Sequence, residues 1–397
     1  MRYLSSLSSA QRLWAVGAVV AAIAIVAAGI VLQRAPEEAT VPEVSTEMSI
    51  REIAPKLGVT GAEVAHALEL SVSVPKRKPL GALGVTQAEL ESAAKHIVEH
   101  TDSTLKYYVF GALVLLAWVF MFRLGRPDGS PVSERKTWYP RAPYVAVLLV
   151  AVAVAGFALG KSPNPMEGGV KFFKSLVGFY PSILVKLLIF LFFIGLAVVG
   201  NKLVCGWACP FGALQELFYS LPLFRRLKRK KVPFRVANTI RGALFGIMLL
   251  LLFGIVGGRK GLVIYHYVNP FNLFSLDFDL ISVGAMVVVA LLLSFAVYRP
   301  FCQFVCPFGF LSWLAERGSL VRVHIDRNKC TECGACDRAC PLQAAGDRVD
   351  GRMFPADCFS CARCLNVCPY DAISYRSVFQ ADEPVGEEGD KDPGGED

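Results

Sequence analysis

The sequence is poor in charged residues. Asp, Glu, Lys and Arg make up only 19% of its 397 residues, whereas hydrophobic residues make up 54%. An ordinary soluble domain has about 25% charged and about 45–50% apolar residues. The shortage of charge therefore excludes a wholly soluble chain and predicts that much of the length lies in a membrane.

Cysteine is missing from the first 204 residues, and all twelve cysteines fall in four tight clusters after that point. Such clustering excludes a secreted disulfide framework and is typical of metal ligation. The sequence also lacks a Gly-x-Gly-x-x-Gly fingerprint after a strand and a phosphate-binding loop. We therefore predict no nucleotide site.

Six apolar runs have the length of membrane-spanning helices, about 18–20 residues for a hydrocarbon core of about 30 Å. Six such runs in one chain argue against buried helices of a soluble protein, and the first one favours an uncleaved anchor over a signal peptide. They are Leu13–Leu32, Leu105–Phe122, Ala142–Leu159, Ile183–Gly200, Ala243–Val256 with its flanks, and Leu280–Val297.

Lys and Arg are distributed unequally between alternate loops, fourteen against five. By the positive-inside rule, the N-terminus and everything after Arg299 are expected to be cytoplasmic, and residues 33–104 lie outside. The predicted location is the bacterial inner membrane, multi-pass. The basic run Arg225–Lys231 fits an anchor on anionic lipid better than a nucleic-acid site, so membrane lipid is expected as a partner and nucleic acid is not.

The expected organisation has five parts. Residues 1–36 form an N-terminal membrane anchor, 37–104 a small periplasmic helical domain, 105–300 the membrane domain, 301–380 a cytoplasmic ferredoxin-like domain, and 381–397 a disordered acidic tail. In the periplasmic part, Leu-Gly-Val-Thr occurs at 57–60 and again at 83–86. Each threonine precedes a glutamate by three residues, Glu63 and Glu89, which predicts two capping boxes and two similar helical units.

Two motifs with the spacing Cys-x2-Cys-x2-Cys-x3-Cys-Pro give the strongest signal. This is the run of bacterial ferredoxins that hold two [4Fe-4S] clusters. Three closely spaced thiolates surround one cluster, and a short helix carries the fourth to the other cluster. Paired zinc knuckles are the alternative, but zinc needs only four ligands in two pairs. The expected ligands are Cys330, Cys333, Cys336 and Cys368 for cluster 1, and Cys358, Cys361, Cys364 and Cys340 for cluster 2.

Two further pairs, Cys205/Cys209 and Cys302/Cys306, follow the fourth and sixth apolar runs. Both read Cys-x3-Cys-Pro-Phe-Gly, with the second motif at 302–307. Cysteines four apart share one face of a helix, so two facing pairs would present four thiolates. Three interpretations stay open: a third iron–sulfur cluster or other metal, a dithiol/disulfide couple, and structural thiols.

With both cysteine classes in view, the chain resembles the membrane-bound polyferredoxins. Members include the ferredoxin-type quinol-side subunit of periplasmic nitrate reductase systems, the C-terminal half of the nitrous oxide reductase regulator, and cytochrome oxidase accessory iron–sulfur proteins. The resemblance covers roughly Ala142 to Tyr375. The regulator would add a flavin on its outer domain, but Thr60-Gly61-Ala62-Glu63 lacks the acceptor threonine, so no flavin is predicted.

The fold class expected is an α-helical polytopic membrane protein of about six spans, with a C-terminal 2[4Fe-4S] ferredoxin-like α+β domain and a small outer helical domain. The resemblance implies electron relay between a cytoplasmic or quinol donor and a membrane or periplasmic acceptor. Such a chain is an electron-transfer subunit rather than a stand-alone enzyme. A multihaem cytochrome or terminal reductase is a candidate partner, and so is a quinone near His266. The alternative for His266 is an incidental histidine in an interfacial aromatic belt. The alternative is an assembly factor that reduces a metal or a thiol in another enzyme.

Overall fold

The computed structural model describes residues 8–32, 42–57, 59, 61–70, 74–75, 78–101, 105–124, 142–160, 163–180, 182–228, 230–256, 261–276 and 281–380. The predicted acidic tail at 381–397 lies outside the described residues, and so does Thr60 of the first predicted capping box.

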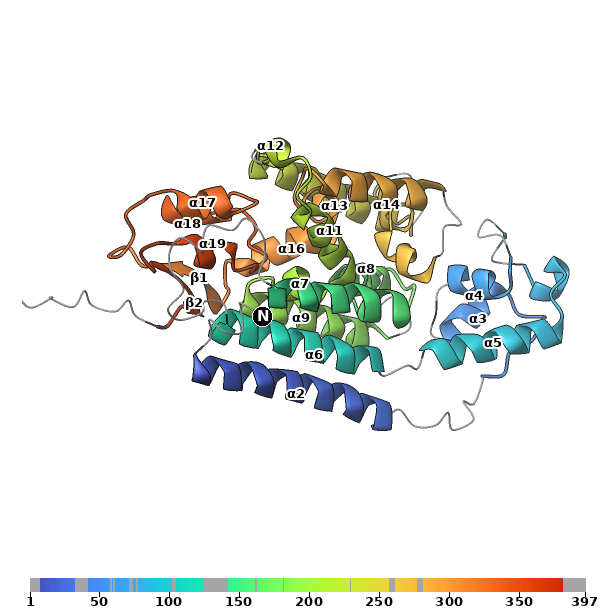
Figure 1. Cartoon of the computed structure of the whole chain (residues 1–397). Coiled ribbons are helices and arrows are strands. Elements are labelled where there is room, and N and C mark those ends of the chain that lie inside the picture. Colours follow the sequence, from blue (N-terminus) through green and yellow to red (C-terminus); the bar gives the residue numbers. More distant parts are fainter. Residues whose placement is uncertain are drawn as a thin grey trace, which may run out of the picture.

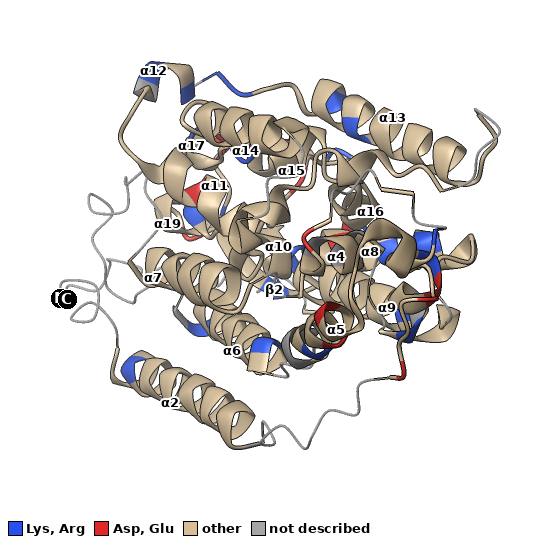
Figure 2. Ribbon diagram, turned by 90° about the vertical axis from the view of Figure 1, so that its right-hand side faces the viewer, with Lys and Arg blue, Asp and Glu red and all other residues tan. Residues whose placement is uncertain are grey.

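Among the described residues, four helices are long and apolar enough to cross a membrane. Two shorter apolar helices follow the same pattern, α7 continued by the π-helix η4, and α14. Figure 2 shows that these helices carry few charged residues along their lengths. The bounds are α2 Ser9–Leu32, α6 Leu105–Val119 continued by the π-helix η2 Phe120–Leu124, α7 Ala142–Val150, η4 Ala151–Ala158, α9 Ile183–Gly200, α13 Phe234–Leu252 and α14 Ile281–Ser294.

The fifth of the expected apolar helices begins before its apolar run. The run predicted it at Ala243–Val256 with its flanks, and α13 extends from Phe234 to Leu252. Pro233 precedes the helix, where its fixed φ and missing N–H are tolerated. The polar first turns belong to the N-terminal flank, because hydropathy marks the apolar stretch of a helix rather than its start.

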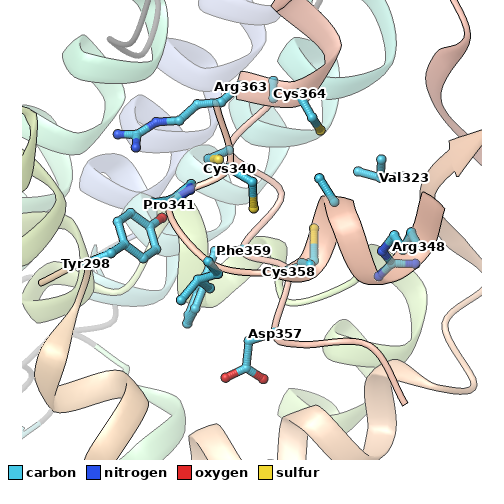
Figure 3. Close-up of a pocket in the computed structure, with 15 residues that line it drawn as sticks. Tyr298, Val323, Cys340, Pro341, Arg348, Asp357, Cys358, Phe359, Arg363 and Cys364 are labelled. Atoms are coloured by element: carbon cyan, nitrogen blue, oxygen red, sulfur yellow. The ribbon is translucent and has the colours of Figure 1, made fainter. Parts of the chain in front are cut away.

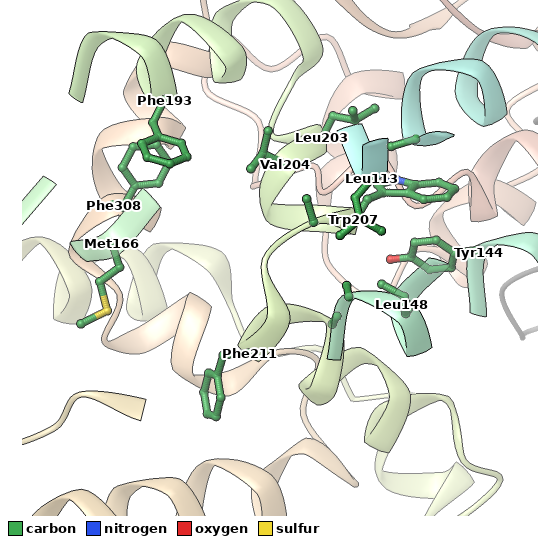
Figure 4. Close-up of a cluster of buried hydrophobic side chains, with 14 of the residues drawn as sticks. Leu113, Tyr144, Leu148, Met166, Phe193, Leu203, Val204, Trp207, Phe211 and Phe308 are labelled. Atoms are coloured by element: carbon green, nitrogen blue, oxygen red, sulfur yellow. The ribbon is translucent and has the colours of Figure 1, made fainter. Parts of the chain in front are cut away.

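Three amphipathic or short helices lie inside the bundle. α8 (Pro165–Leu176) packs on α9, α11 (Pro210–Ser220) packs on α7, η4 and α14, and α16 (Pro307–Glu316) packs on α8, α9 and α13. Each of these helices begins with a proline at its first position. Their apolar side chains join one core, shown in Figure 4 around Trp207, Tyr144 and Leu148, which are fully buried.

The small helical part comprises α3 (Ile50–Lys56), α4 (Gly61–Ala67), the 3-10 turn η1 (Leu80–Leu83) and α5 (Gln87–Thr101). It has a hydrophobic cluster of its own. The capping box of α5 is confirmed, because Thr86 N–H donates to Glu89 Oε2 at 2.9 Å and Glu89 N–H to Thr86 Oγ1 at 3.3 Å. At the start of α3, Ser49 N–H donates to Glu52 Oε2 at 2.8 Å, which is one half of a capping box. This contact was missed although its Ser-x-x-Glu pattern is visible.

The ferredoxin-like part is a two-stranded antiparallel sheet with three short helices. β1 (Val321–Ile325) pairs with β2 (Ile373–Ser377), with Val323 opposite Tyr375. The helices are α17 (Ala335–Ala339), α18 (Ala344–Val349) and α19 (Arg363–Val367). Figure 1 shows this part at one end of the helical bundle and α3–α5 at the other end.

Candidate iron–sulfur sites and membrane cysteines

The two ferredoxin motifs have the same unusual backbone. In each, the residue before the second cysteine and the residue after it have positive φ: Glu332 at 54° and Gly334 at 68°, Ser360 at 49° and Ala362 at 61°. Alternation of left-handed with ordinary residues turns successive amides to one side and forms an anion-binding nest, as in many iron–sulfur sites. These left-handed positions thus favour a binding site for an iron–sulfur cluster over a zinc knuckle.

One cavity, called the inner cavity here, lies between the second motif and the bundle. It has an empty volume of about 450 Å³ and is lined by Cys340, Cys358, Cys361 and Cys364. Figure 3 shows the thiols of Cys340 and Cys358 turned toward each other across it. These are the four cysteines of the second expected ligand set.

A second cavity, called the outer cavity, has an empty volume of about 350 Å³. Its lining includes the four cysteines of the first expected set, Cys330, Cys333, Cys336 and Cys368. In both cases the fourth cysteine comes from the other motif, and one helical turn, α17 or α19, lies between the third and fourth cysteines. The assignment of these cysteines as ligands stays a prediction.

The thiols stand too far apart for one metal ion. In the described part of the chain, no three Cys, His, Asp or Glu side chains group closely enough to hold a single ion. Four sulfurs on zinc, each about 2.3 Å from the metal, would be grouped that closely. The two nests, each next to four cysteines, instead suit a larger group such as a [4Fe-4S] cluster.

Burial keeps several of these thiols protonated when nothing compensates their charge. It raises the pKa of Cys336 to about 11, and the pKa values of Cys358 and Cys361 also to about 11, although Arg348 opposes the shift at Cys358 and Arg363 at Cys361. Thiolates at these positions therefore need a positively charged partner, which an iron–sulfur core supplies when bound.

Two buried ion networks join the ferredoxin-like part to the bundle. In the first, Glu216 of α11 lies 3.0 Å from Arg299 and 2.5 Å from Arg363. All three side chains are at most 3% exposed. Arg299 precedes the short helix α15 (Pro300–Phe304), while Arg363 opens α19. The network thus connects α11 of the bundle to the second ferredoxin motif.

The second network is centred on Asp357, next to Cys358. Asp357 contacts Lys202 and lies 2.8 Å from Arg241, and Glu316 lies 3.8 Å from Lys202 and 2.9 Å from Arg348. Burial acts to raise the pKa of Asp357, but Arg241 and Lys202 outweigh it and hold that pKa below its usual value. Sequence reasoning missed these residues. The available signal was ionisable side chains within or beside apolar segments.

Close backbone contacts complete the junction. Trp207 donates from its indole to the Ser360 carbonyl at 2.9 Å, and Tyr375 donates to the Gly200 carbonyl at 2.8 Å. A Cβ on Gly206 would stand 2.1 Å from the Phe359 carbonyl oxygen. Only glycine allows this approach, so the second motif is seated directly on the turn that carries Cys205.

The membrane cysteine pairs do not share one helix face as expected. Cys205 lies in α10 (Leu203–Trp207), which ends before Cys209, and Cys209 is extended with φ −72° and ψ 115°. Cys306 is likewise extended, with φ −62° and ψ 117°, after α15. The physical reason is the following proline, which disfavours helical conformation in the residue before it.

The two pairs nevertheless approach each other. Burial and then the charge of Cys302 raise the pKa of Cys209 to about 12, and the same causes raise the pKa of Cys306. Gln215 of α11 also donates to Cys302 Sγ at 3.5 Å. This bond places the second pair beside α11, the helix that begins directly after Cys209. Convergence of the four thiols on a common centre stays a prediction.

Each of the two Cys-x3-Cys-Pro repeats donates hydrogen bonds to the other from a cationic side chain. Arg299, from the second repeat, donates to the Cys205 and Gly206 carbonyls, while Lys202, from the first repeat, donates to the Gly309 carbonyl at 3.3 Å. The Cys302 carbonyl accepts from Arg241 at 3.0 Å. Fixed positive charges thus surround both cysteine turns, a setting in which negative charge is stabilised.

Aromatic side chains fill the space between the membrane thiols and the inner cavity. Tyr219, Tyr298 and Phe359 form one small cluster with Leu342, and Cys205, Cys302 and Cys340 pack against it. Tyr298 and Phe359 lie 5.9 Å apart between ring centroids and also line the inner cavity, as Figure 3 shows. The cavity and the membrane cysteines are therefore neighbours across one layer of side chains.

The residue named for a quinone site lies in the loop between α13 and α14. His266, in the 3-10 turn η5 (Ile264–His266), has its Nε2 3.1 Å from Nζ of the buried Lys174 in α8. This contact makes His266 part of a polar pair rather than an isolated surface group. Its connection to a quinone stays a prediction.

Two family models match the stretches of the chain that contain these sites. A model of a 4Fe-4S binding domain matches residues 183–231 and again 280–328, the two stretches that contain the Cys-x3-Cys-Pro pairs. A model of a 4Fe-4S dicluster domain matches residues 329–373, which contain both ferredoxin motifs.

The chain is similar to the membrane-bound polyferredoxins.

Three relatives illustrate the range of this polyferredoxin family. An uncharacterised protein of Methanocaldococcus jannaschii is 29% identical over 51% of this chain and 78% of its own length. The ferredoxin-type protein NapH of Haemophilus influenzae is 29% identical over 46% of this chain and 65% of its own. The regulatory protein NosR of Pseudomonas aeruginosa is 33% identical over 42% of this chain and 23% of its own. No solved structure matches significantly.

The resemblance drawn from the cysteine motifs is thus confirmed. This chain is an iron–sulfur protein of the electron-transfer type, with several apolar helices suited to a membrane. Because it spans less than two thirds of NapH and about a quarter of NosR, the activities of those proteins are not transferred to it.

Proposed function

We propose that this chain relays single electrons between a donor at its ferredoxin-like end and a redox partner in or across a bacterial inner membrane. The observation that carries the proposal is the contact layer of Tyr298 and Phe359. It places the inner cavity next to Cys205 and Cys302, so an electron held at the second motif is close to the membrane core.

The proposed cofactors are two [4Fe-4S] clusters that supply one-electron chemistry when bound. The outer cavity would hold one through Cys330, Cys333, Cys336 and Cys368, and the inner cavity the other through Cys358, Cys361, Cys364 and Cys340. The two cavities and the four left-handed residues support this crossed assignment. The protein's own part is to seat the thiolates and to direct backbone amides at the cluster sulfurs.

The membrane cysteines are proposed as the next station of the relay. The 4Fe-4S binding model covers Cys205, Cys209, Cys302 and Cys306, and fixed cations surround their turns. A third redox or metal centre held by these thiols would extend the path toward a quinone or a partner subunit. A serine variant of all four cysteines should lose metal or an optical signal while both ferredoxin clusters persist.

The proposed topology has about six spans, with the N-terminus and ferredoxin-like end cytoplasmic and α3–α5 periplasmic. The position of those two parts at opposite ends of the bundle in Figure 1 and the positive-inside charge bias support it. A reporter active only in the periplasm should work when fused near Pro79 and fail near Tyr375. Activity at Tyr375 would contradict a cytoplasmic relay.

The test of the clusters is analysis of the anaerobically purified full chain. The two ferredoxin clusters are expected to contribute about eight iron and eight sulfide. The matched variants Cys340→Ser and Cys368→Ser each remove the one ligand that a motif contributes to the cluster of the other motif. Cys340→Ser should damage the cluster of Cys358, Cys361 and Cys364, and Cys368→Ser the cluster of the first motif. If each variant instead damages the cluster of its own motif, the crossed assignment is wrong.

A further inference from the structure

The two cavities of the ferredoxin-like part differ in the charge of their walls. The inner cavity is lined by two arginines, Arg348 and Arg363, and by Asp357. The outer cavity is lined by Glu332 and by no Lys or Arg. Figure 3 shows Arg348 and Arg363 on opposite sides of the inner cavity. The motifs that build the cavities are nearly the same, so this asymmetry comes from what surrounds them.

The buried networks at the inner cavity carry more positive than negative charge. Arg299 and Arg363 share the single carboxylate Glu216. In the second network three cations meet two carboxylates, and the most exposed of these side chains, Arg348, is only 12% exposed. Its members are Lys202, Arg241 and Arg348 with Glu316 and Asp357. Each network therefore has one positive charge in excess.

The environment makes these charges effective. Two unit charges interact several times more strongly in a protein interior than in water. Near the outer cavity, Arg338 donates to the Cys333 carbonyl at 3.1 Å, but Arg338 and Cys333 are both exposed. Solvent and salt screen that arginine. Burial alone would disfavour an added electron at the inner site, and the two excess buried cations act against that penalty.

We propose that the inner site has the higher reduction potential of the two, and that Arg348 and Arg363 are the residues that set this order. A single electron given to the ferredoxin-like part then leaves the outer site, which is oxidised by one electron, and reduces the inner site by one. The electron comes to rest beside the layer that contacts Cys205 and Cys302. The inference rests on the proposed function, since it requires both clusters.

The experiment is a potentiometric titration of the anaerobic full-length protein, followed by electron paramagnetic resonance. Signals are assigned with Cys340→Ser, which removes the inner set's ligand. The inner signal is expected to appear first, with at least a tenfold preference of the electron for that site, which corresponds to 59 mV. Equal potentials or the reverse order would overturn the inference.

Variants that remove single charges distinguish an effect on the reduction potential from a loss of structure. Arg363→Gln should lower the inner potential and leave the outer potential unchanged. The double variant Arg363→Gln/Glu216→Gln removes one positive and one negative charge, so the inner potential should return toward that of the unchanged protein. Arg338→Gln, the matched control at the screened outer site, should shift either potential less. Arg348→Gln gives the same test if Arg363→Gln does not fold.

Iron and sulfide content distinguishes the two possible failures. If two clusters are absent from the unchanged protein, the proposed function fails and this inference fails with it. If both clusters are present but Arg363→Gln and Arg348→Gln leave the inner potential where it was, only the inference is wrong.

Discussion

The two ends of the molecule are attached to the bundle in different ways. The ferredoxin-like end shares its hydrophobic core with the bundle, since Val323, Ile373 and Tyr375 pack in the same cluster as Trp207. It also shares two buried ion networks. The α3–α5 end has a separate core and an exposed capping box at the start of α5. The first end is thus built as part of the membrane unit, and the second as a unit of its own.

The two ends obtain the specificity of their assembly in different ways. Buried ion pairs add little stability over well-packed apolar side chains, but leaving one partner alone in the interior is costly. The junction of the ferredoxin-like end therefore tolerates few alternative arrangements. The helical end depends on local signals in its own sequence.

The largest effect is expected from Asp357→Asn. The change leaves Lys202 and Arg241 without their shared carboxylate in a site where the side chains are at most 1% exposed. Loss of one partner of a buried pair costs about 3–5 kcal/mol. Hydrogen exchange in β1 and β2 should rise, while exchange in α5 stays the same.

The matched control for that variant is Asp350→Asn. Asp350 lies 3.4 Å from Arg352, and both side chains are more than half exposed. Removal of such a surface pair should cost at most about 1 kcal/mol. If Asp357→Asn exchanges no faster than Asp350→Asn, the buried network does not hold the junction.

A smaller effect is expected from Gly206→Ala. The new methyl group would collide with the carbonyl oxygen of Phe359. Because this oxygen belongs to the backbone, it cannot move aside as the end of a flexible side chain could. Overpacking of this kind costs about 1–3 kcal/mol. Proteolysis within 330–375 should become faster. Gly195→Ala in α9, where nothing lies within 4 Å, is the control and should change nothing; equal proteolysis of both variants would contradict the close seating.

The smallest effect is a pH dependence confined to the α3–α5 end. The amide of Thr86 lowers the pKa of Glu89 below its usual value. The capping box therefore stabilises α5 fully above the unfolded pKa of Glu, and this contribution is lost as the pH falls through the lower folded value. Hydrogen exchange at the first turn of α5, corrected for the intrinsic rate, should rise there.

Glu89→Gln separates this effect from general acid loosening, because the amide keeps a hydrogen-bond acceptor and loses the charge. The variant should show no such pH dependence at α5. If the unchanged protein and Glu89→Gln respond alike, the charge of Glu89 does not contribute to the helix start.

The sequence determined most of the local structure and the kind of chemistry. Hydropathy located the apolar helices, because lipid requires long apolar runs with internally satisfied backbones. The Thr86-x-x-Glu89 pattern located a helix start. The cysteine spacings led to the polyferredoxin family, because a cluster needs thiolates at fixed intervals in the chain.

The tertiary structure alone decided how the parts are coupled. No spacing in the sequence shows that Glu216 meets Arg363, or that Phe359 stands between the inner cavity and Cys205, since these contacts join residues far apart in the chain. Helix periodicity also misled at Cys205 and Cys209, where the proline turn ends α10. Ligand spacing is a local property, whereas the charge around a site is a sum over neighbours that only folding brings together.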